Sequence, residues 1–316
     1  MGLLPPSNSV RLWHGTFATF SALLLALAGC GPTPRRVVVY ASQDQVYAEP
    51  ILKRFTEETG IRVDAIYDSE AVKTVGLANR LIAEQARPVA DLFWGNEELR
   101  TRQLAARGVL KGGDHLLEIG SRSRCLIYNR NLLSHHELPP SMIELTNSRW
   151  SGKIALAYPL FGSTSTHFLL LRQHWGESNW LTWCRALVAN KPILFEGNSM
   201  VAGAVGRGQC LVGLTDSDDF ESEFRSGKPV ARAAWTPELS RLANTVGRTP
   251  QGPHPQEAAE LMRYLASDSV KQALTQAHAL EPYPSSEQPL SEQQWEATIR
   301  DVVEATGQLK DLFLRP

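Results

Sequence analysis

Polar side chains follow four strand-like segments of this sequence at the point where each segment ends. They are Ser42 and Asp44, then Glu70, then Asn96 and Glu97, and finally Asp216, Asp218 and Asp219. The carboxyl ends of parallel strands meet at one edge of a sheet, and ligands bind there because helices begin there. Each cluster alone could be a helix N-cap, since Ser, Asp and Asn are preferred at that position. Four clusters at one edge favour an oxygen-rich binding site.

A run of small hydroxylated residues offers a second kind of chemistry. Ser163, Thr164, Ser165 and Thr166 follow a glycine and open a helix-like segment, and Asn198 opens another. Backbone N–H groups, hydroxyls and the positive end of a helix suit a phosphate or a carboxylate. Carboxylates on one wall and an anion cradle on another predict a ligand that is a cation with its counter-anion, or a zwitterion.

The sequence matches known catalytic motifs poorly. The segment Gly197-Asn198-Ser199-Met200-Val201 begins like the nucleophile elbow G-x-S-x-G, but a valine replaces the final glycine. The eight histidines show no H-E-x-x-H spacing, and no phosphate-binding P-loop is present. We therefore expect a protein that is not an enzyme. The catalytic alternative is a hydrolase that uses Ser165 or Ser199 with His167.

The composition excludes several classes of protein. The chain has 316 residues, 43% of them hydrophobic, with 32 Lys and Arg against 33 Asp and Glu. A disordered chain would be less hydrophobic, and a general nucleic-acid binder would need a basic surface. We therefore expect no nucleic-acid partner, and enough chain for one large domain or two lobes.

The first thirty residues have the layout of an export signal. Arg11 precedes the apolar run 17–28, and the segment ends Leu27-Ala28-Gly29-Cys30. The run is about half of the roughly 20 apolar residues that a transmembrane helix needs. Its end resembles a bacterial lipobox, which implies removal of residues 1–29, a lipid on Cys30 and a tether over 30–35. The protein would then be exported to the periplasm or the cell surface and held at the membrane by the lipid only. The alternative is an ordinary cleaved signal with a chance cysteine.

Three further cysteines, Cys125, Cys184 and Cys210, are widely spaced and form no C-x-x-C pair. This spacing excludes a zinc knuckle and a redox motif. One disulfide with one remaining thiol is a possible alternative, but we expect three buried thiols that pack as small hydrophobic residues.

Strand and helix patterns alternate along the rest of the chain. Strands are predicted at 36–41, 61–65, 89–94, 124–128, 153–157, 192–195 and 210–214, and helices at 49–59, 71–82, 166–174, 179–188 and 198–207. This alternation predicts an α/β protein with two lobes, each built on a mostly parallel sheet. The chain is mostly helical from residue 255. Ser291 and Gln294 predict a capping box for a last helix with Trp295, Ile299, Val302 and Val303 on its buried face.

The sequence resembles the ferric-ion-type family of bacterial extracellular (periplasmic) solute-binding proteins of ABC importers. The resemblance is carried by residues 37–40, 49–52, 55–61, 73–81, 90–94, 126–129, 150–153, 159–167, 196–199 and 212–216. It implies the two-lobed type II periplasmic-binding-protein fold, with a mostly parallel or mixed sheet flanked by helices in each lobe and a ligand cleft between them. The expected lobe 1 is 36–122 with 244–285, and lobe 2 is 123–243 with the C-terminal helix 286–316. A monomer that delivers its solute to an ABC permease and ATPase is implied as well.

The resemblance carries over the iron site only in part. Members that hold ferric iron directly use a histidine, a glutamate and a tyrosine pair, and the matching places here are Asp44, Asn96 and Asp218 with Asp219. Because no tyrosine pair occurs in the chain, phenolate ligation is not predicted, whereas carboxylates still suit a hard cation. The candidate metal ligands are therefore Asp44, Asp218 and Asp219. The anion-binding loop 163–166 and the asparagine at 198 are retained.

These observations predict a lipid-anchored solute receptor of an ABC importer. Its solute would be iron(III), another metal or a metal–anion complex, and two lobes would close on it as binding shifts their open and closed populations. No cofactor is expected apart from a metal ion carried as the solute. Two alternatives remain: a receptor for an organic cation or a phosphonate-like zwitterion, and a sensor lipoprotein that has the fold without transport.

Overall fold

The computed structural model describes residues 1–2, 34–68, 75–234, 238, 241–281 and 290–314. Contacts divide the chain into Met1–Arg35 and Arg36–Pro316, and the second unit contains every helix and strand described below. It has hydrophobic cores of its own, so we expect it to fold without the first 35 residues. Cys30 and Glu70 lie outside the described residues. In the part of the chain that is described, no helix is long and apolar enough to cross a membrane.

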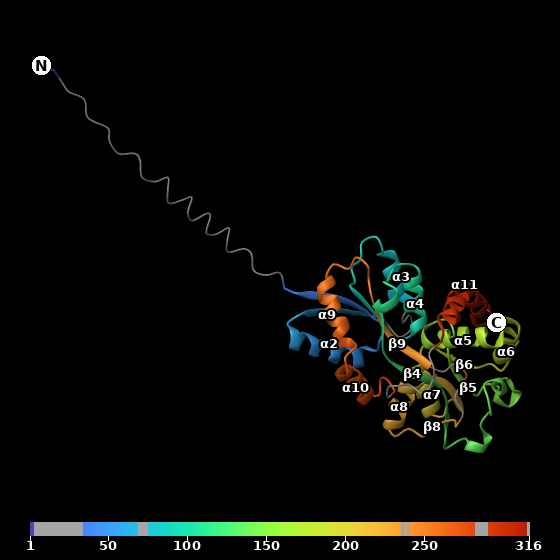
Figure 1. Ribbon diagram of the computed structural model, residues 1–316. Helices are drawn as coiled ribbons and strands as arrows, with labels where there is room; N and C mark the ends of the chain where they lie inside the picture. Colours follow the sequence, from blue (N-terminus) through green and yellow to red (C-terminus); the bar gives the residue numbers. More distant parts are fainter. Residues whose placement is uncertain (3–33, 69–74, 235–237, 239–240, 282–289, 315–316) are drawn as a thin grey trace. The chain divides into compact units, whose positions relative to one another are not determined.

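A nine-stranded mixed sheet organises the second unit, in the order β2-β1-β3-β9-β4-β7-β5-β6, with β8 paired to β4 (Figure 1). The strands are β1 (Arg36–Ala41), β2 (Arg62–Tyr67), β3 (Leu92–Gly95), β4 (Leu116–Asn129), β5 (Ile154–Ala157), β6 (Ile193–Phe195), β7 (Val212–Asp216), β8 (Val230–Arg232) and β9 (Arg241–Arg248). Strand β1 runs parallel to β2 and β3, and β5 runs parallel to β6 and β7. The two parallel groups are joined through the antiparallel strands β4 and β9.

Helices cover both faces of each parallel group. They are α2 (Gln45–Thr59), α3 (Val75–Ala83), α4 (Glu98–Ala106), α5 (Gly162–Trp175), α6 (Glu177–Ala189), α7 (Asn198–Gly206), α8 (Ser217–Arg225), α9 (Pro255–Leu265), α10 (Asp268–Gln276) and α11 (Glu292–Leu314). Successive side chains of a strand point to opposite faces. Val37 and Val39 therefore pack with α2, α9 and α10, while Val38 and Tyr40 pack with α3 and α4. This arrangement confirms the predicted α/β class.

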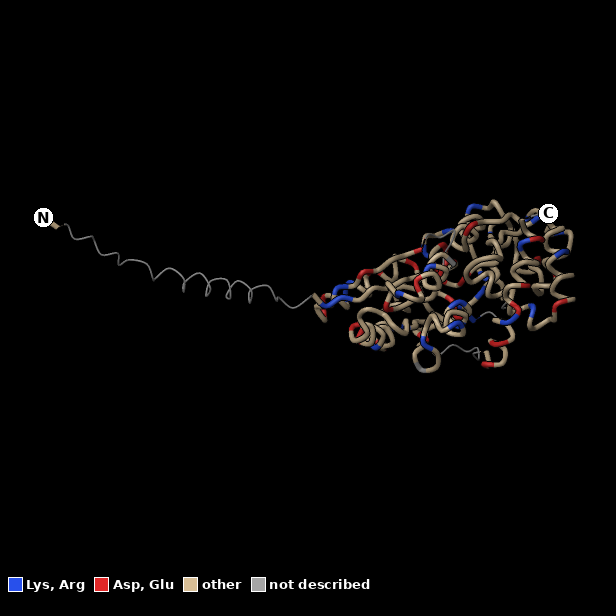
Figure 2. Tube along the Cα trace, turned by 90° about the horizontal axis from the view of Figure 1, so that it is seen from above, with Lys and Arg blue, Asp and Glu red and all other residues tan. Residues whose placement is uncertain are grey.

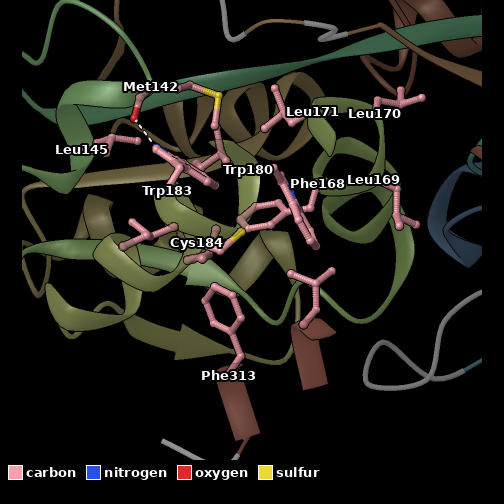
Figure 3. Packing of buried hydrophobic residues seen from close by; sticks show 14 of the residues in the cluster. Met142, Leu145, Phe168, Leu169, Leu170, Leu171, Trp180, Trp183, Cys184 and Phe313 are labelled. Atoms are coloured by element: carbon pink, nitrogen blue, oxygen red, sulfur yellow. Dashed lines mark hydrogen bonds between the residues drawn. The ribbon is translucent and has the colours of Figure 1, made fainter. Parts of the chain in front are cut away.

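The other parallel group has the largest apolar cluster, built on α5, α6 and α11. The ring of Phe168 lies 5.4 Å from that of Trp183 and 6.0 Å from that of Phe313, centroid to centroid (Figure 3). Trp183 donates its indole N–H to the carbonyl of Met142 at 3.0 Å, so the buried polar group is satisfied (Figure 3). This core fixes the start of α5, which carries the hydroxylated run.

Strand β4 helps to link the two groups. Its first part pairs with β9 from Leu116 to Ser123, and its last part pairs with β7 from Arg124 to Tyr128. The sequence patterns predicted only 124–128 as a strand and missed β9, because charged and small residues interrupt both segments. Acidic and basic residues are interspersed along the traced chain of this unit (Figure 2).

Several predicted boundaries were wrong. Helix α2 begins at Gln45, four residues before the predicted start, so Pro50 lies inside the helix. Strand β7 extends to Asp216, which is therefore the last residue of the strand. On α11 the capping box is present, since Ser291 and Gln294 exchange hydrogen bonds, but Val303 is 73% exposed and not buried.

The three cysteines of this unit, Cys125, Cys184 and Cys210, are free and buried, as expected. Burial raises the pKa of the Cys125 thiol to about 12 and that of Cys210 to about 11. All three are therefore uncharged packing residues at neutral pH.

Candidate functional site

A cavity of about 370 Å³ opens where four helices of the second unit begin. Its lining is mostly polar and consists of Asp44, Gln45, Val46, Tyr47, Asn96, Arg122, Ala157, Tyr158, Phe161, Gly162, Ser163, Thr164, Glu196, Gly197, Asn198, Ser199, Asp216, Asp218, Asp219 and Ser222. The N-termini of α2, α5, α7 and α8 all contribute to it. The structure thus brings together eight of the candidate ligand-binding residues: Asp44, Asn96, Ser163, Thr164, Asn198, Asp216, Asp218 and Asp219.

Two buried arginines of β4 lie against these carboxylates. Arg122 and Arg124 are two residues apart and so share one face of the strand; the exposed fraction of their side chains is 4% and 0%. Arg124 Nη1 lies 2.5 Å from Asp216 Oδ1, and Arg122 Nε lies 3.3 Å from Asp216 Oδ2. Arg122 Nη1 also lies 3.2 Å from Asp218 Oδ2. Sequence reasoning missed both arginines, although their i, i+2 spacing in the run Arg-Ser-Arg was the signal that could have found them.

The arginines separate the protonation behaviour of the two neighbouring aspartates. Burial acts to raise the pKa of Asp216, but Arg124, Arg122 and the Ser163 hydroxyl outweigh it and hold that pKa below its usual range. For Asp218, burial raises the pKa, Arg122 only partly opposes it, and the charge of Asp216 raises it further. Asp216 is therefore the firmly ionised member, and Asp218 is the one that takes up a proton more easily.

The hydroxylated run forms a network with the same aspartate. Ser163 Oγ donates to Asp216 Oδ2 at 2.5 Å, and Asn198 Nδ2 donates to Ser163 Oγ at 2.8 Å. Thr164 Oγ1 and Arg124 Nη1 both donate to Asn198 Oδ1, at 3.1 and 3.0 Å. Because the Ser163 hydroxyl proton is directed at a carboxylate, anion binding here would depend on the backbone N–H groups at the starts of α5 and α7.

The other candidates are not part of the cavity lining. Ser42, Glu97, Ser165 and Thr166 are buried away from it. Glu97 accepts a hydrogen bond from Thr166 Oγ1 at 2.8 Å and caps α4 by accepting from the backbone N–H of Arg100. Burial raises the pKa of Glu97, and the charge of Arg100 opposes this. This contact joins the start of α4 to α5 behind the cavity.

Three carboxylates are grouped closely enough to share a cation. One oxygen each of Asp216, Asp218 and Asp219 lies within 4.8 Å of the others. Tyr47 and Tyr158, which the sequence analysis did not select, line the same cavity. Burial and the nearby charges of Asp218 and Asp219 raise the pKa of Tyr47, so its phenol is protonated at neutral pH. Carboxylate, phenol and hydroxyl oxygens are the donors that hard cations prefer.

Residues 36–278 match the family described as "Bacterial extracellular solute-binding protein". The chain belongs to this family. Two curated relatives are the major ferric iron-binding protein of Neisseria meningitidis, 24% identical over 221 residues, and the Fe(3+)-binding periplasmic protein of Serratia marcescens, 27% identical over 211 residues. The first alignment covers 64% of this chain and 65% of the relative, and the second covers 61% of each. The chain thus aligns with less than two thirds of the length of either relative.

Solved structures agree on the fold of this solute-binding family member. Iron-bound HitA from Pseudomonas aeruginosa superimposes with a TM-score of 0.77 at 20% identity, covering 89% of this chain and all of HitA. AfuA from Actinobacillus pleuropneumoniae, with fructose-6-phosphate bound, gives 0.76 at 16% identity, covering 90% of this chain and all of AfuA. These likenesses confirm the predicted two-lobed periplasmic-binding-protein fold.

The geometry around His167 does not support the hydrolase alternative. His167 is completely buried, and its Nε2 lies 2.8 Å from the backbone oxygen of Glu238. Burial, followed by the charge of Arg124, lowers the pKa of His167 to about 3. An imidazole that is so weakly basic and has no access to solvent is unsuited to activate a serine.

Proposed function

We propose that this protein is the exported, lipid-anchored receptor of an ABC importer and that it binds iron(III), another metal or a metal–anion complex. The observation that carries the proposal is the cavity that gathers Asp44, Asp216, Asp218 and Asp219. Among the described residues, its lining carries five carboxylates, counting Glu196, against one arginine, an excess of negative charge that a bound cation would compensate. The names of the two curated relatives support iron as the cation.

Closure of two lobes would complete the site. We propose that lobe 1 consists of 36–122 and 244–285, and lobe 2 of 123–243 and 286–316. The start of α2 and Asn96 then line the cavity from lobe 1, while α5, α7 and α8 line it from lobe 2. Arg122 lies on β4, which runs from one lobe to the other. A ligand that touches both walls stabilises the closed arrangement.

A phosphonate-like zwitterion, or an organic cation, is the second candidate solute. It is favoured by Arg122, which lines the cavity beside the N-termini of four helices. The fructose-6-phosphate of AfuA shows that this fold can accommodate a phosphorylated ligand. The carboxylates would then bind the cationic part of the solute.

Thermal unfolding of the unit 36–316 in the presence of four different ligands tests the proposal. The ligands are ferric citrate, citrate alone, 2-aminoethylphosphonate and putrescine. Binding to the folded state alone adds about 2.7 kcal/mol at a ligand concentration 100 times Kd, so Tm rises. We expect ferric citrate to raise Tm and citrate alone not to do so. A rise with the phosphonate or putrescine only would support the second candidate, and no rise with any ligand would contradict the receptor proposal.

A further inference from the structure

A second cavity, of about 590 Å³, lies between α3, α4, α11 and the segment that leads into α5. We call it the α11 groove; its lining consists of Ala78, Asn79, Ile82, Arg100, Gln103, Leu104, Arg107, Leu160, Phe161, Val302, Val303, Thr306, Lys310 and Leu314. Of these described residues, only Phe161 also lines the main cavity. Its size falls within the ordinary range of small-molecule sites, about 300–1,000 Å³.

The floor and one rim of the α11 groove are apolar. Leu104, Leu160 and Val302 are buried and belong to the cores on either side. At the rim, Val303 is 73% exposed and Leu314 is 46% exposed, both on α11. These two aliphatic side chains continue the apolar floor to the surface of the groove.

The charged side chains of the α11 groove are all basic. Of the residues that the structure describes, Arg100, Arg107 and Lys310 line it, and no acidic residue does. Within the described ranges, neither Arg107 nor Lys310 has an ion-pair partner. Arg100 Nη1 donates to Gln103 Oε1 at 2.6 Å. Burial lowers the pKa of Arg100, Glu97 opposes this, and Arg107 lowers it further, so like charges are held close together here.

We propose that the α11 groove is a binding site for an amphipathic anion, a small molecule with an aliphatic or aromatic chain and a carboxylate. Its chain would lie on Leu104, Leu160 and Val302, and its carboxylate would pair with Arg107 and Lys310. A guanidinium can bind a carboxylate through two parallel hydrogen bonds, which also fixes the orientation of the ligand. The groove therefore selects the opposite charge from the acidic main cavity.

Calorimetric titration of the unit 36–316 with decanoate, decan-1-ol and acetate tests the site. We expect saturable binding of one decanoate per chain. Decan-1-ol, which lacks the charge, and acetate, which lacks the chain, should bind at least tenfold more weakly. Equal binding of decanoate and decan-1-ol would overturn the proposal, as would the absence of saturable decanoate binding.

Variants locate the binding to the groove. Val303→Asp adds a negative charge at an exposed position, and Arg107→Ala with Lys310→Ala removes two positive charges; each change should weaken decanoate binding at least tenfold. The matched control, Arg185→Ala with Lys228→Ala, removes two exposed positive charges elsewhere and should leave the affinity unchanged. An unchanged affinity in Val303→Asp, with an unchanged Tm, would overturn the proposal. Since no metal is added, this outcome does not depend on the solute of the main cavity.

Discussion

Asp216 is the residue on which the buried network of the main cavity depends. Its two carboxylate oxygens contact Arg122, Arg124, Ser163 and Asn198. The sequence identified this aspartate from its place after a strand. The pairing of Arg122 and Arg124 with this aspartate was not predicted, because β4 lies about ninety residues earlier in the chain and becomes a neighbour only when the sheet forms.

Replacement of Arg124 by methionine should destabilise the protein strongly. The variant leaves Asp216 buried without its closest cation, and breaking a buried pair in this way costs about 3–5 kcal/mol. Because the pair holds the pKa of Asp216 low, its contribution is present above the unfolded-state pKa of about 3.9 and is lost as pH falls through the lower folded-state value. Urea unfolding at pH 7 and in acid measures this loss. Arg225→Met, at an exposed position, should change the unfolding free energy by less than about 0.5 kcal/mol.

Asp218 and Asp219 should behave differently from Asp216. The raised pKa of Asp218 means that its ionised form costs free energy in the folded state above pH about 3.9. We therefore expect Asp218→Asn with Asp219→Asn to leave the Tm of the ligand-free protein at pH 7 unchanged or slightly higher, and to abolish the rise caused by ferric citrate. A large fall in the ligand-free Tm would instead identify the pair as structural helix caps.

At the scale of elements, β7 and α7 approach each other closely through a glycine. A Cβ atom on Gly213 would lie 2.8 Å from methyl groups of both Val201 and Val205. Helix α7 begins at Asn198, so this contact also sets the position of one wall of the main cavity. The strand pattern showed where β7 lies, but the sequence alone gave no sign that its glycine meets a helix.

Gly213→Ala should therefore displace α7. Overpacking of this kind costs about 1–3 kcal/mol, and the shift of Asn198 should also weaken the response to ferric citrate. Gly307→Ala is the matched control, since a Cβ there meets nothing within 4 Å and the position lies on the exposed side of α11; we expect it to stabilise by about 0.5–1 kcal/mol. Thermal unfolding of both variants measures the difference. Equal Tm values would show that α7 can move away without cost.

The elements with the most regular patterns were predicted best. The apolar run at 36–41 and the alternation of strands and helices gave the α/β class, because burial on both faces of a parallel strand leaves a plain signature. Strands β4 and β9 were missed or shortened because they carry Arg122, Arg124 and Asn244 inward. Their side chains are satisfied by partners from distant segments, and such pairing leaves no local pattern.

At the scale of the whole molecule, the proposed lipid anchor rests on Cys30. Cys30→Ser removes the thiol to which a lipid would be attached. We expect the wild-type chain, expressed in a bacterium that processes lipoproteins, to incorporate labelled palmitate and to sediment with membranes, and the variant to incorporate none. Cys184→Ser is a control that keeps the total number of cysteines equal to that of the variant, and it should still be labelled. Labelling of Cys30→Ser would contradict the anchor.

The two proposed sites should influence each other through Phe161. This residue lines both cavities and directly precedes α5, whose first turn borders the main cavity. The α11 groove draws its walls from α3 and α4 on one side and α11 on the other, and the proposed lobe boundaries place these in different lobes. A ligand there should stabilise the same closed arrangement as the solute. We expect saturating decanoate to tighten ferric citrate binding about fivefold, the lower end of ordinary coupling between sites.

Coupling between binding sites is reciprocal, which provides an internal check. Ferric citrate must tighten decanoate binding by the same factor, and titrations in both orders measure this directly. Phe161→Ala should reduce the factor toward one while each ligand still binds alone, whereas Phe224→Ala, on an exposed face of α8, should leave it unchanged. If both ligands bind and the factor is one in the unmodified protein, the sites are independent and the two lobes close without moving the walls of the groove.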